Sequence, residues 1–340
     1  MSHWFGITIK SFLGMFIINL LYLLCFLIVI AYFTLLERKL MASVQRRTGP
    51  CVVGFYGLLQ PIADGLKLLT KEIIIPRKAN KVLFFLAPLL SLILALFPWC
   101  LIPFDDRTII IDLPLNLLFL LLISSLNVYG LIISGWASNS KYAFLGALRS
   151  TAQVISYELS MGFIFLTVGM FVGSFNLSDI VSYQAVSGVW LGVICFPLVI
   201  IFIIVMLAET NRIPFDLAEA EAEIVAGYNI EYSSIIFAMF FLAEYSNMLL
   251  MSAIIVLLFF GGWNFPFSTG GSLFLCVKII LFAILFVLIR SSIPRYRYDQ
   301  LMYLGWKVLL PLTFPFFIFY SGLIKKFSLS ISEYTLIIVK

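Results

Sequence analysis

The chain has 340 residues, of which 62% are hydrophobic and 11% are charged, and its mean hydropathy is +1.10. So few polar residues cannot cover a soluble domain, in which about half of the residues are apolar. The composition therefore excludes a soluble protein and predicts an integral membrane protein. The net charge of +5 comes from connecting segments, and we do not interpret it as a nucleic-acid-binding surface.

Long apolar runs predict helical membrane spans. A bilayer core of about 30 Å requires about 20 apolar residues per helical crossing, whereas barrel strands alternate over about ten residues. The chain is therefore expected to be one all-α transmembrane domain over residues 1–340, with eight transmembrane helices. The predicted spans are residues 12–36, 82–102, 113–135, 151–175, 188–208, 233–260, 272–289 and 306–324.

Basic residues predict the orientation of these spans. If the spans alternate in direction, connections on one side carry 16 of the 22 Lys and Arg residues. Such an excess marks the side from which the protein is inserted, the cytoplasm or the mitochondrial matrix. Both termini are then expected on the opposite side. The connections of this inner side are residues 37–81, 136–150, 209–232 and 290–307.

Motifs for nucleotides and metals do not occur in the sequence. Its one histidine is His3, and its five cysteines are widely spaced without a CxxC pair. Neither GxGxxG nor a Walker A motif occurs. We therefore expect no metal site and no NAD, FMN or iron–sulfur cluster bound by this chain.

The first inner connection contains an amphipathic helical pattern, "LLQPIADGLKLLTKE". Pro61 suits the first turn of such a helix. Apolar residues recur at spacings of three and four and predict one apolar stripe. The helix either lies in the plane of the membrane interface or docks on the protein's own spans. The stripe consists of Leu58, Ile62, Leu66, Leu69 and Ile73.

The third inner connection, "ETNRIPFDLAEAEAEIVAGYNIE" at 209–231, holds six carboxylates and one basic residue, Arg212. Pro214 is expected to stop the preceding helix. Asp216 then suits the N-cap of a short helix over 217–226. Crowded carboxylates near a bilayer are candidates to exchange protons near neutral pH. The alternative is a solvated acidic loop, or one that binds a basic partner.

Three further charged residues lie inside predicted spans. Glu158 and Glu244 have no basic residue one helical turn away in the sequence. Ionisable groups in a bilayer are costly and usually face a polar cavity or relay. Together with Glu209 they predict a hydrated path toward the middle of the membrane. Lys278 either extends to the outer surface or belongs to a relay.

Basic residues cluster in two inner segments, "ERKLMASVQRRTGP" and "RSSIPRYRYDQLMYLGWK", and in the second they lie among tyrosines. Part of this pattern is the positive-inside signal with interfacial Tyr and Trp anchors. We also expect these arginines to pair with the acids of 209–231, because charges at such depth need partners.

Six motifs in order, covering about residues 35–312, resemble the chain 1 family of NADH:ubiquinone oxidoreductase, the membrane subunit of respiratory complex I. Besides the first of the two segments just quoted, they are "GLLQPIADGLKLLTKE", "GWASNSKYAFLGALRSTAQVISYE", "AETNRIPFDLAEAEAEIVAGYNIEYS", "FFLAEY" and "PRYRYDQLMYLGWKVLLPLT". The resemblance implies eight transmembrane helices, a wall of the ubiquinone channel and the start of a proton route.

The resemblance also implies roles for single residues. It assigns to the proton path the acids Glu158, Glu209, Asp216, Glu219, Glu221, Glu223, Glu231 and Glu244. It assigns to the quinone channel and its polar wall Glu37, Arg38, Arg47, Asp64, Arg290, Arg295, Arg297 and Asp299. Arg46 receives no role, because that position is often apolar in the family.

The resemblance implies partners as well. These are the peripheral quinone-reducing subunits of complex I, which carry the iron–sulfur clusters, neighbouring membrane-arm subunits and membrane lipids, with no nucleic acid. The 34 phenylalanines and abundant isoleucine suggest an AT-rich gene. That composition favours the mitochondrial inner membrane over a bacterial plasma membrane.

Three other functions are compatible with parts of the sequence. A proton-coupled transporter predicts internal repeats, which are not evident. A purely structural anchor for peripheral subunits gives no reason for Glu158 and Glu244 inside the bilayer. The related subunit of membrane-bound hydrogenases would couple hydrogen chemistry instead of quinone chemistry, and the near-complete run of motifs favours the quinone enzyme.

Overall fold

The computed structural model describes residues 2–106, 108–216, 227–265, 268–269 and 271–327. Its chain divides into two compact units, Met1–Thr70 and Lys71–Lys340. Each unit is described by itself, and the expectation of a single domain stays a prediction.

The first unit contains α1 (Ser2–Val44), the single turn η1 (Phe55–Gly57) and α2 (Gln60–Thr70). Within α1, the stretch Leu20–Val44 is long and apolar enough to cross a membrane. α2 is the expected amphipathic helix, and Pro61 lies in its first turn as predicted. Its apolar stripe is exposed, with Leu66 at 56% and Leu69 at 59%. The interfacial position and docking on the protein's own spans both stay predictions.

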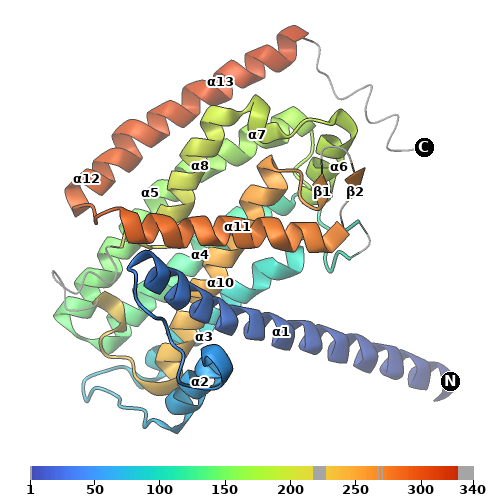
Figure 1. Cartoon of the computed structure of the whole chain (residues 1–340). Coiled ribbons are helices and arrows are strands. Elements are labelled where there is room, and N and C mark those ends of the chain that lie inside the picture. Colours follow the sequence, from blue (N-terminus) through green and yellow to red (C-terminus); the bar gives the residue numbers. More distant parts are fainter. Residues whose placement is uncertain (1, 107, 217–226, 266–267, 270, 328–340) are drawn as a thin grey trace. The chain divides into compact units, whose positions relative to one another are not determined.

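The second unit is a bundle of helices (Figure 1). Its long helices are α3 (Lys81–Leu96), α4 (Asn116–Ser138), α5 (Lys141–Val172), α10 (Ser234–Phe259), α11 (Gly271–Ser292) and α13 (Leu310–Phe327). Its shorter elements are η2 (Phe97–Leu101), α6 (Leu177–Ser187), α7 (Leu191–Ile194), α8 (Phe196–Glu209), η3 (Gly227–Asn229), α12 (Tyr298–Tyr303) and the π-helical η4 (Leu304–Leu309). Strands β1 (Asn264–Phe265) and β2 (Ser268–Thr269) form one antiparallel pair.

The all-α membrane class is confirmed. Among the described residues, seven helices are long and apolar enough to span a bilayer, and they match every predicted span except the fifth. In that region the chain forms α7 and then α8, with Cys195 between them. The 14 residues of α8 extend about 21 Å, which is less than the thickness of a bilayer core. The count of eight spans therefore stays a prediction.

Two predicted connections are more helical than expected. The inner connection predicted at 136–150 is shorter in the structure, because α4 ends at Ser138 and α5 begins at Lys141. An outer connection contains α6, whose first turn is capped by the side chain of Asn176. That side chain accepts a hydrogen bond from the backbone N–H of Ser178 at 3.2 Å, as N-cap residues do.

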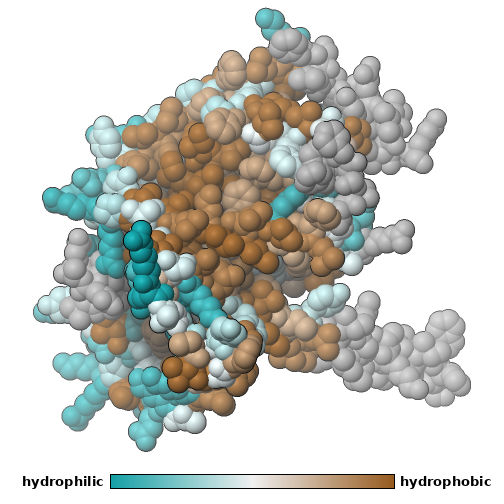
Figure 2. All heavy atoms as spheres, viewed as in Figure 1, coloured by the Kyte–Doolittle hydropathy of each residue, from teal (hydrophilic) through white to brown (hydrophobic). Residues whose placement is uncertain are grey.

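Burial separates the central helix of the second unit from its lipid-facing helices. In the most apolar 18-residue window of each span, 78% of the residues are buried in α10, but 28% in α11 and 17% in Tyr298–Lys326. A helix that is apolar on all sides and buried belongs inside a bundle. Figure 2 shows mainly hydrophobic side chains over the helices of one face and hydrophilic ones along the left margin. Such a face suits lipid tails.

Small residues let neighbouring backbones approach closely. A Cβ atom at Gly135 of α4 would lie 2.4 Å from the Cβ of Ala147 in α5. A Cβ atom at Gly146 of α5 would lie 2.8 Å from the Cα of Gly227, at the start of η3. Lipid tails are as apolar as side chains, so helix association in membranes depends on such close packing. These crossings fix α5 relative to α4 and η3.

Candidate functional site

A cavity lies among the helices of the second unit. It offers about 70 Å³ to the centres of water-sized molecules, and one ordered water needs roughly 10–15 Å³ on this scale. The cavity therefore has room for several waters. α3, α4, α10 and the end of α8 contribute to its wall, and its polar lining residues are Ser91, Ser124, Asn127, Glu209, Thr210, Asn211, Tyr228, Glu244 and Asn247.

The three acids expected inside the membrane are neighbours of this cavity. Glu209, the last residue of α8, and Glu244, from α10, both line it. Glu158 of α5 accepts a hydrogen bond at 3.4 Å from the hydroxyl of Ser124, which also lines the cavity. Glu158 and Glu209 interact electrostatically. Three carboxylates from separate helices thus lie at or beside one cavity, although most of the residues that line this cavity are apolar.

Glu244 has a basic partner that its own helix does not supply. The Nε atom of Arg212 lies 2.6 Å from its Oε1 atom, and both side chains are largely buried. The guanidinium of Arg212 also lies over the ring of Tyr245, 4.6 Å from its centroid. A buried charge requires such a partner, and the segment after α8 provides it. The sequence correctly indicates that no basic residue lies one turn from Glu244, but not that Arg212 pairs with it.

The segment that carries Arg212 is anchored to the connection after α11. Asp216 is buried, and its Oδ2 lies 3.4 Å from a guanidinium nitrogen of Arg295. The backbone N–H of Tyr296 donates to the carbonyl of Pro214 at 3.1 Å, and the rings of Phe215 and Tyr296 stack at 5.5 Å. The expected pairing of inner-side arginines with these acids is confirmed for Arg295 and Asp216.

The other residues of the basic stretch lie nearer the surface. Arg297 pairs with Asp299 at 3.3 Å, and both side chains are 77% exposed. Such exposed pairs contribute about 0–1 kcal/mol to stability. Arg290 lies in the last turn of α11 and is half-buried.

Gln153 is a buried residue of α5 that the sequence analysis missed. Its side-chain NH2 group donates to the carbonyl of Ala208 and to the carbonyl of Phe215, each at 2.8 Å. One side chain thereby contacts both ends of residues 208–215, which carry Glu209 and Arg212, and Asp216 follows directly. A glutamine within a predicted span was the available signal, since uncharged polar groups there also need partners.

Part of the acidic segment lies outside the described residues. The predicted helix over 217–226 and three of its carboxylates fall there, namely Glu219, Glu221 and Glu223. Glu231 is described and half-buried, but it is not among the residues that line the cavity. Pro214 follows the end of α8, as predicted.

Within the first unit, the structure brings together two of the four predicted channel residues. A guanidinium nitrogen of Arg38 in α1 lies 2.7 Å from the Oδ2 of Asp64 in α2, and Gln60 donates to the other carboxylate oxygen at 3.0 Å. Glu37 is buried. Arg47 is exposed and donates to the side chain of Gln45 at 2.7 Å.

Lys278 contacts the connection after α10, which is on the predicted outer side, as expected if it extends toward the outer surface. Its ammonium group donates to the carbonyls of Phe260, Gly262 and Asn264 at 2.8, 2.8 and 2.7 Å. It also lies 5.4 Å from the ring centroid of Trp190. The last carbonyls of a helix lack intrahelical partners and attract cations. Lys278 therefore stabilises the chain where α10 ends.

These features define a class: an all-helical, multi-pass membrane protein with ionisable side chains gathered at a cavity between its helices. The sequence model of the family described as NADH dehydrogenase matches residues 17–321. The chain belongs to this family.

Named relatives are similar over most of their length. NADH-ubiquinone oxidoreductase chain 1 of Chondrus crispus is 53% identical over 89% of this chain and 94% of the relative. The protein of the same name from Arabidopsis thaliana is 54% identical over 88% and 93%. The bacterium Paramagnetospirillum magneticum has an NADH-quinone oxidoreductase chain that is 57% identical over 84% of each protein.

Proposed function

We propose that this chain is the membrane subunit of a proton-translocating NADH:ubiquinone oxidoreductase, respiratory complex I. In this proposal it lines the access channel for ubiquinone and couples quinone reduction to proton translocation through buried carboxylates. Family membership and the names of the relatives support the enzyme. The observation that carries the coupling is the shared cavity of Glu209 and Glu244, to which Ser124 links Glu158.

The arrangement suits proton exchange for a physical reason. Among the described residues, the buried Oε2 atom of Glu209 has no hydrogen-bond partner. Buried polar atoms require one, so this oxygen is suited to a proton or a water molecule. Because Glu158 is its electrostatic neighbour, the two acids are expected to titrate as a coupled set. Arg212 supplies the positive charge opposite the buried Glu244.

In this proposal, the change in charge that moves protons comes from reduction of the quinone. Electrons arrive from partner subunits, and a reduced quinone requires protons. Two unit charges roughly 8 Å apart, at an effective dielectric constant of about 20, interact by about 2 kcal/mol. A change of that size redistributes a shared proton between neighbouring carboxylates. Asp216 and Arg295 then connect the acidic segment with the basic stretch that the family resemblance assigns to the channel wall.

Carboxylate replacement in the assembled complex tests the coupling. Glu209→Gln and Glu158→Gln keep side-chain volume but cannot release a proton, so quinone reduction and proton pumping are expected to fall about 10-fold or more, as for loss of an acid–base group. NADH oxidation by a water-soluble acceptor reports assembly and should persist. The matched control is Asp179→Asn, in the first turn of α6. Wild-type reduction and pumping in both glutamine variants would refute the coupling role.

Photo-crosslinking tests the quinone channel separately. A quinone analogue with a long photoreactive tail is expected to label residues 37–75 or 209–232. The same photoreactive tail without the quinone headgroup serves as the control probe. Labelling of lipid-facing spans alone, equal for both probes, would contradict the channel assignment.

The cellular compartment is part of the proposal. The relatives include algal and plant chains named for ubiquinone and a bacterial chain named for quinone. We place this chain in the mitochondrial inner membrane, on its composition of 34 phenylalanines in 340 residues. Fractionation of source cells with an antibody to the chain checks this, and recovery with a bacterial plasma membrane would exclude it.

A further inference from the structure

A second pocket lies where α3 begins and where α4 meets α5, outside the carboxylate cavity. Its volume of about 420 Å³ is within the range of roughly 300–1,000 Å³ that is typical of small-molecule sites. By the distribution of basic residues, this end of the helices is the predicted inner side. The pocket is lined by Lys78, Asn80, Gly135, Trp136, Asn139, Ser140, Lys141 and Phe144.

Hydrogen bonds fix the walls of this pocket relative to each other. The side-chain nitrogen of Asn139 donates to the carbonyl of Lys78 at 3.2 Å. The backbone N–H of Asn80 donates to the carbonyl of Ala137 at 3.1 Å. Asn139 has a left-handed backbone conformation with φ 52°, which turns the chain sharply between α4 and α5. The loop before α3 and this turn therefore form one preformed surface.

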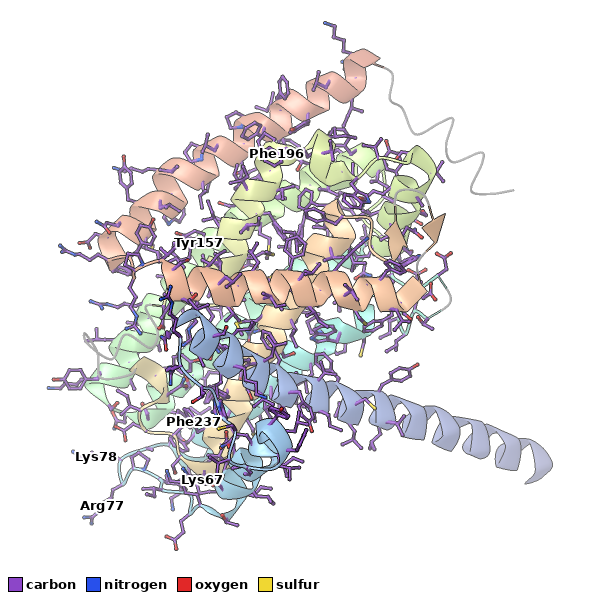
Figure 3. All side chains as sticks on the ribbon, viewed as in Figure 1. Lys67, Arg77, Lys78, Tyr157, Phe196 and Phe237 are labelled. Carbon is purple, nitrogen blue, oxygen red and sulfur yellow. The ribbon has the colours of Figure 1, made fainter. Side chains whose placement is uncertain are left out.

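The pocket combines positive charge with an aromatic wall. Lys78 and Lys141 are exposed, and its described lining residues include no carboxylate. Figure 3 shows Lys78 beside Arg77 on the loop before α3, with both side chains directed away from the helices. Trp136 is 64% exposed and meets Phe144 edge to face at 5.9 Å. Exposed tryptophans at helix ends are typical of the membrane–water interface.

We propose that this pocket binds the phosphate headgroup of an anionic phospholipid from the inner leaflet. Lysines at the level of the headgroups attract anionic lipids, and lysine binds phosphate as a point charge. The rings of Trp136 and Phe144 contact the glycerol and the upper part of the acyl chains. The site takes a lipid rather than an acidic protein segment because its charged and apolar parts lie side by side at the predicted membrane surface.

Lipid photolabelling of the intact complex tests this site. The complex is placed in phosphatidylcholine nanodiscs that contain a trace of photoactivatable phosphatidylglycerol, and labelled peptides are mapped. Labelling is expected in residues 78–81 and 135–144. Each lysine near the lipid surface contributes about a fivefold preference, so Lys78→Gln combined with Lys141→Gln should lower labelling about twenty-five-fold. Arg77→Gln, beside the pocket but not in its lining, is the matched control and should retain wild-type labelling.

Several outcomes would overturn the proposal. A photoactivatable phosphatidylcholine that labels the same peptides equally well would show no selection for anionic lipid. An equal loss in Arg77→Gln would indicate diffuse surface charge instead of a pocket. Abolition of labelling by millimolar inorganic phosphate would indicate a soluble anion. Absence of lipid labelling, with crosslinks from Lys141 to another protein chain, would assign the pocket to a partner subunit.

Discussion

Replacement of Gln153 by leucine is expected to uncouple quinone reduction from proton translocation without touching any acid. The side chain donates to the carbonyls of Ala208 and Phe215, each at 2.8 Å, and is fully buried. Leucine has a similar size but leaves both carbonyls without this donor. The carbonyl of Ala208 keeps the backbone N–H of Asn211 at 3.3 Å, so the main loss is the donor to Phe215. A buried polar group without its partner costs about 1–3 kcal/mol.

This loss falls on the segment that positions the site. Between the two carbonyls lie Glu209 and Arg212, and Asp216 follows directly. Release of the segment is expected to weaken the contact of Arg212 with Glu244, now 2.6 Å, and that of Asp216 with Arg295, now 3.4 Å. Both contacts order the proposed proton path, so pumping should fall more than electron transfer. The assay is the ratio of protons pumped to NADH oxidised in reconstituted vesicles.

Gln184 offers a matched control for this substitution. It is also buried, and its side-chain nitrogen also donates to two backbone carbonyls, those of Leu257 and Leu258, each at 3.1 Å. Gln184 belongs to α6 and contacts the end of α10. It does not line the carboxylate cavity. Gln184→Leu should therefore reduce thermal stability by a similar amount and leave the proton ratio unchanged. A normal ratio in Gln153→Leu, or an equal drop in both variants, would refute the reasoning.

Three further substitutions have expected outcomes. Arg212→Gln removes the basic partner that lies 2.6 Å from the buried Glu244 and should destabilise the protein by about 3–5 kcal/mol, whereas the double variant with Glu244→Gln should lose less, as measured by thermal inactivation. Equal losses would argue against the pair. Lys278→Met removes three bonds to carbonyls and should cost about 2–4 kcal/mol, read as faster proteolysis near residue 260. Gly135→Val should clash with Ala147 and prevent assembly; wild-type yield would show that α4 and α5 separate easily.

The spans were predictable because a bilayer sets a length and a polarity that a single sequence window reveals. The same windows predict a fifth span at 188–208, where the structure has α7 and α8 with Cys195 between them within an apolar run of unchanged composition, so this span stays a prediction. α6 was missed although its cap, Asn176, is visible in the sequence. An N-cap residue locates the start of a helix only when other features already predict that helix. The apolar pattern after Asn176 is short and does not predict one.

The sequence was sufficient to predict individual residues of the candidate site, but not how these residues are arranged in space. A carboxylate inside a span is visible in the sequence because it is costly there, which identified Glu158 and Glu244. The partner of Glu244 comes from the loop after another helix, and such pairings depend on how helices pack. Lys278 shows the same limit, since the sequence indicates its depth in a span but not which carbonyls it meets.

The attachments of α5 have a consequence for how this family can vary. Gln153 binds the chain at Phe215, and Gly146 packs against Gly227 where the chain returns. These anchor points are seven residues apart on one helix, about 10 Å along its axis. Both contacts depend on the position of one helix. Substitution at Gly146 or Gln153 is therefore expected to disturb the chain at Phe215 or at Gly227, so these two positions should vary little among relatives.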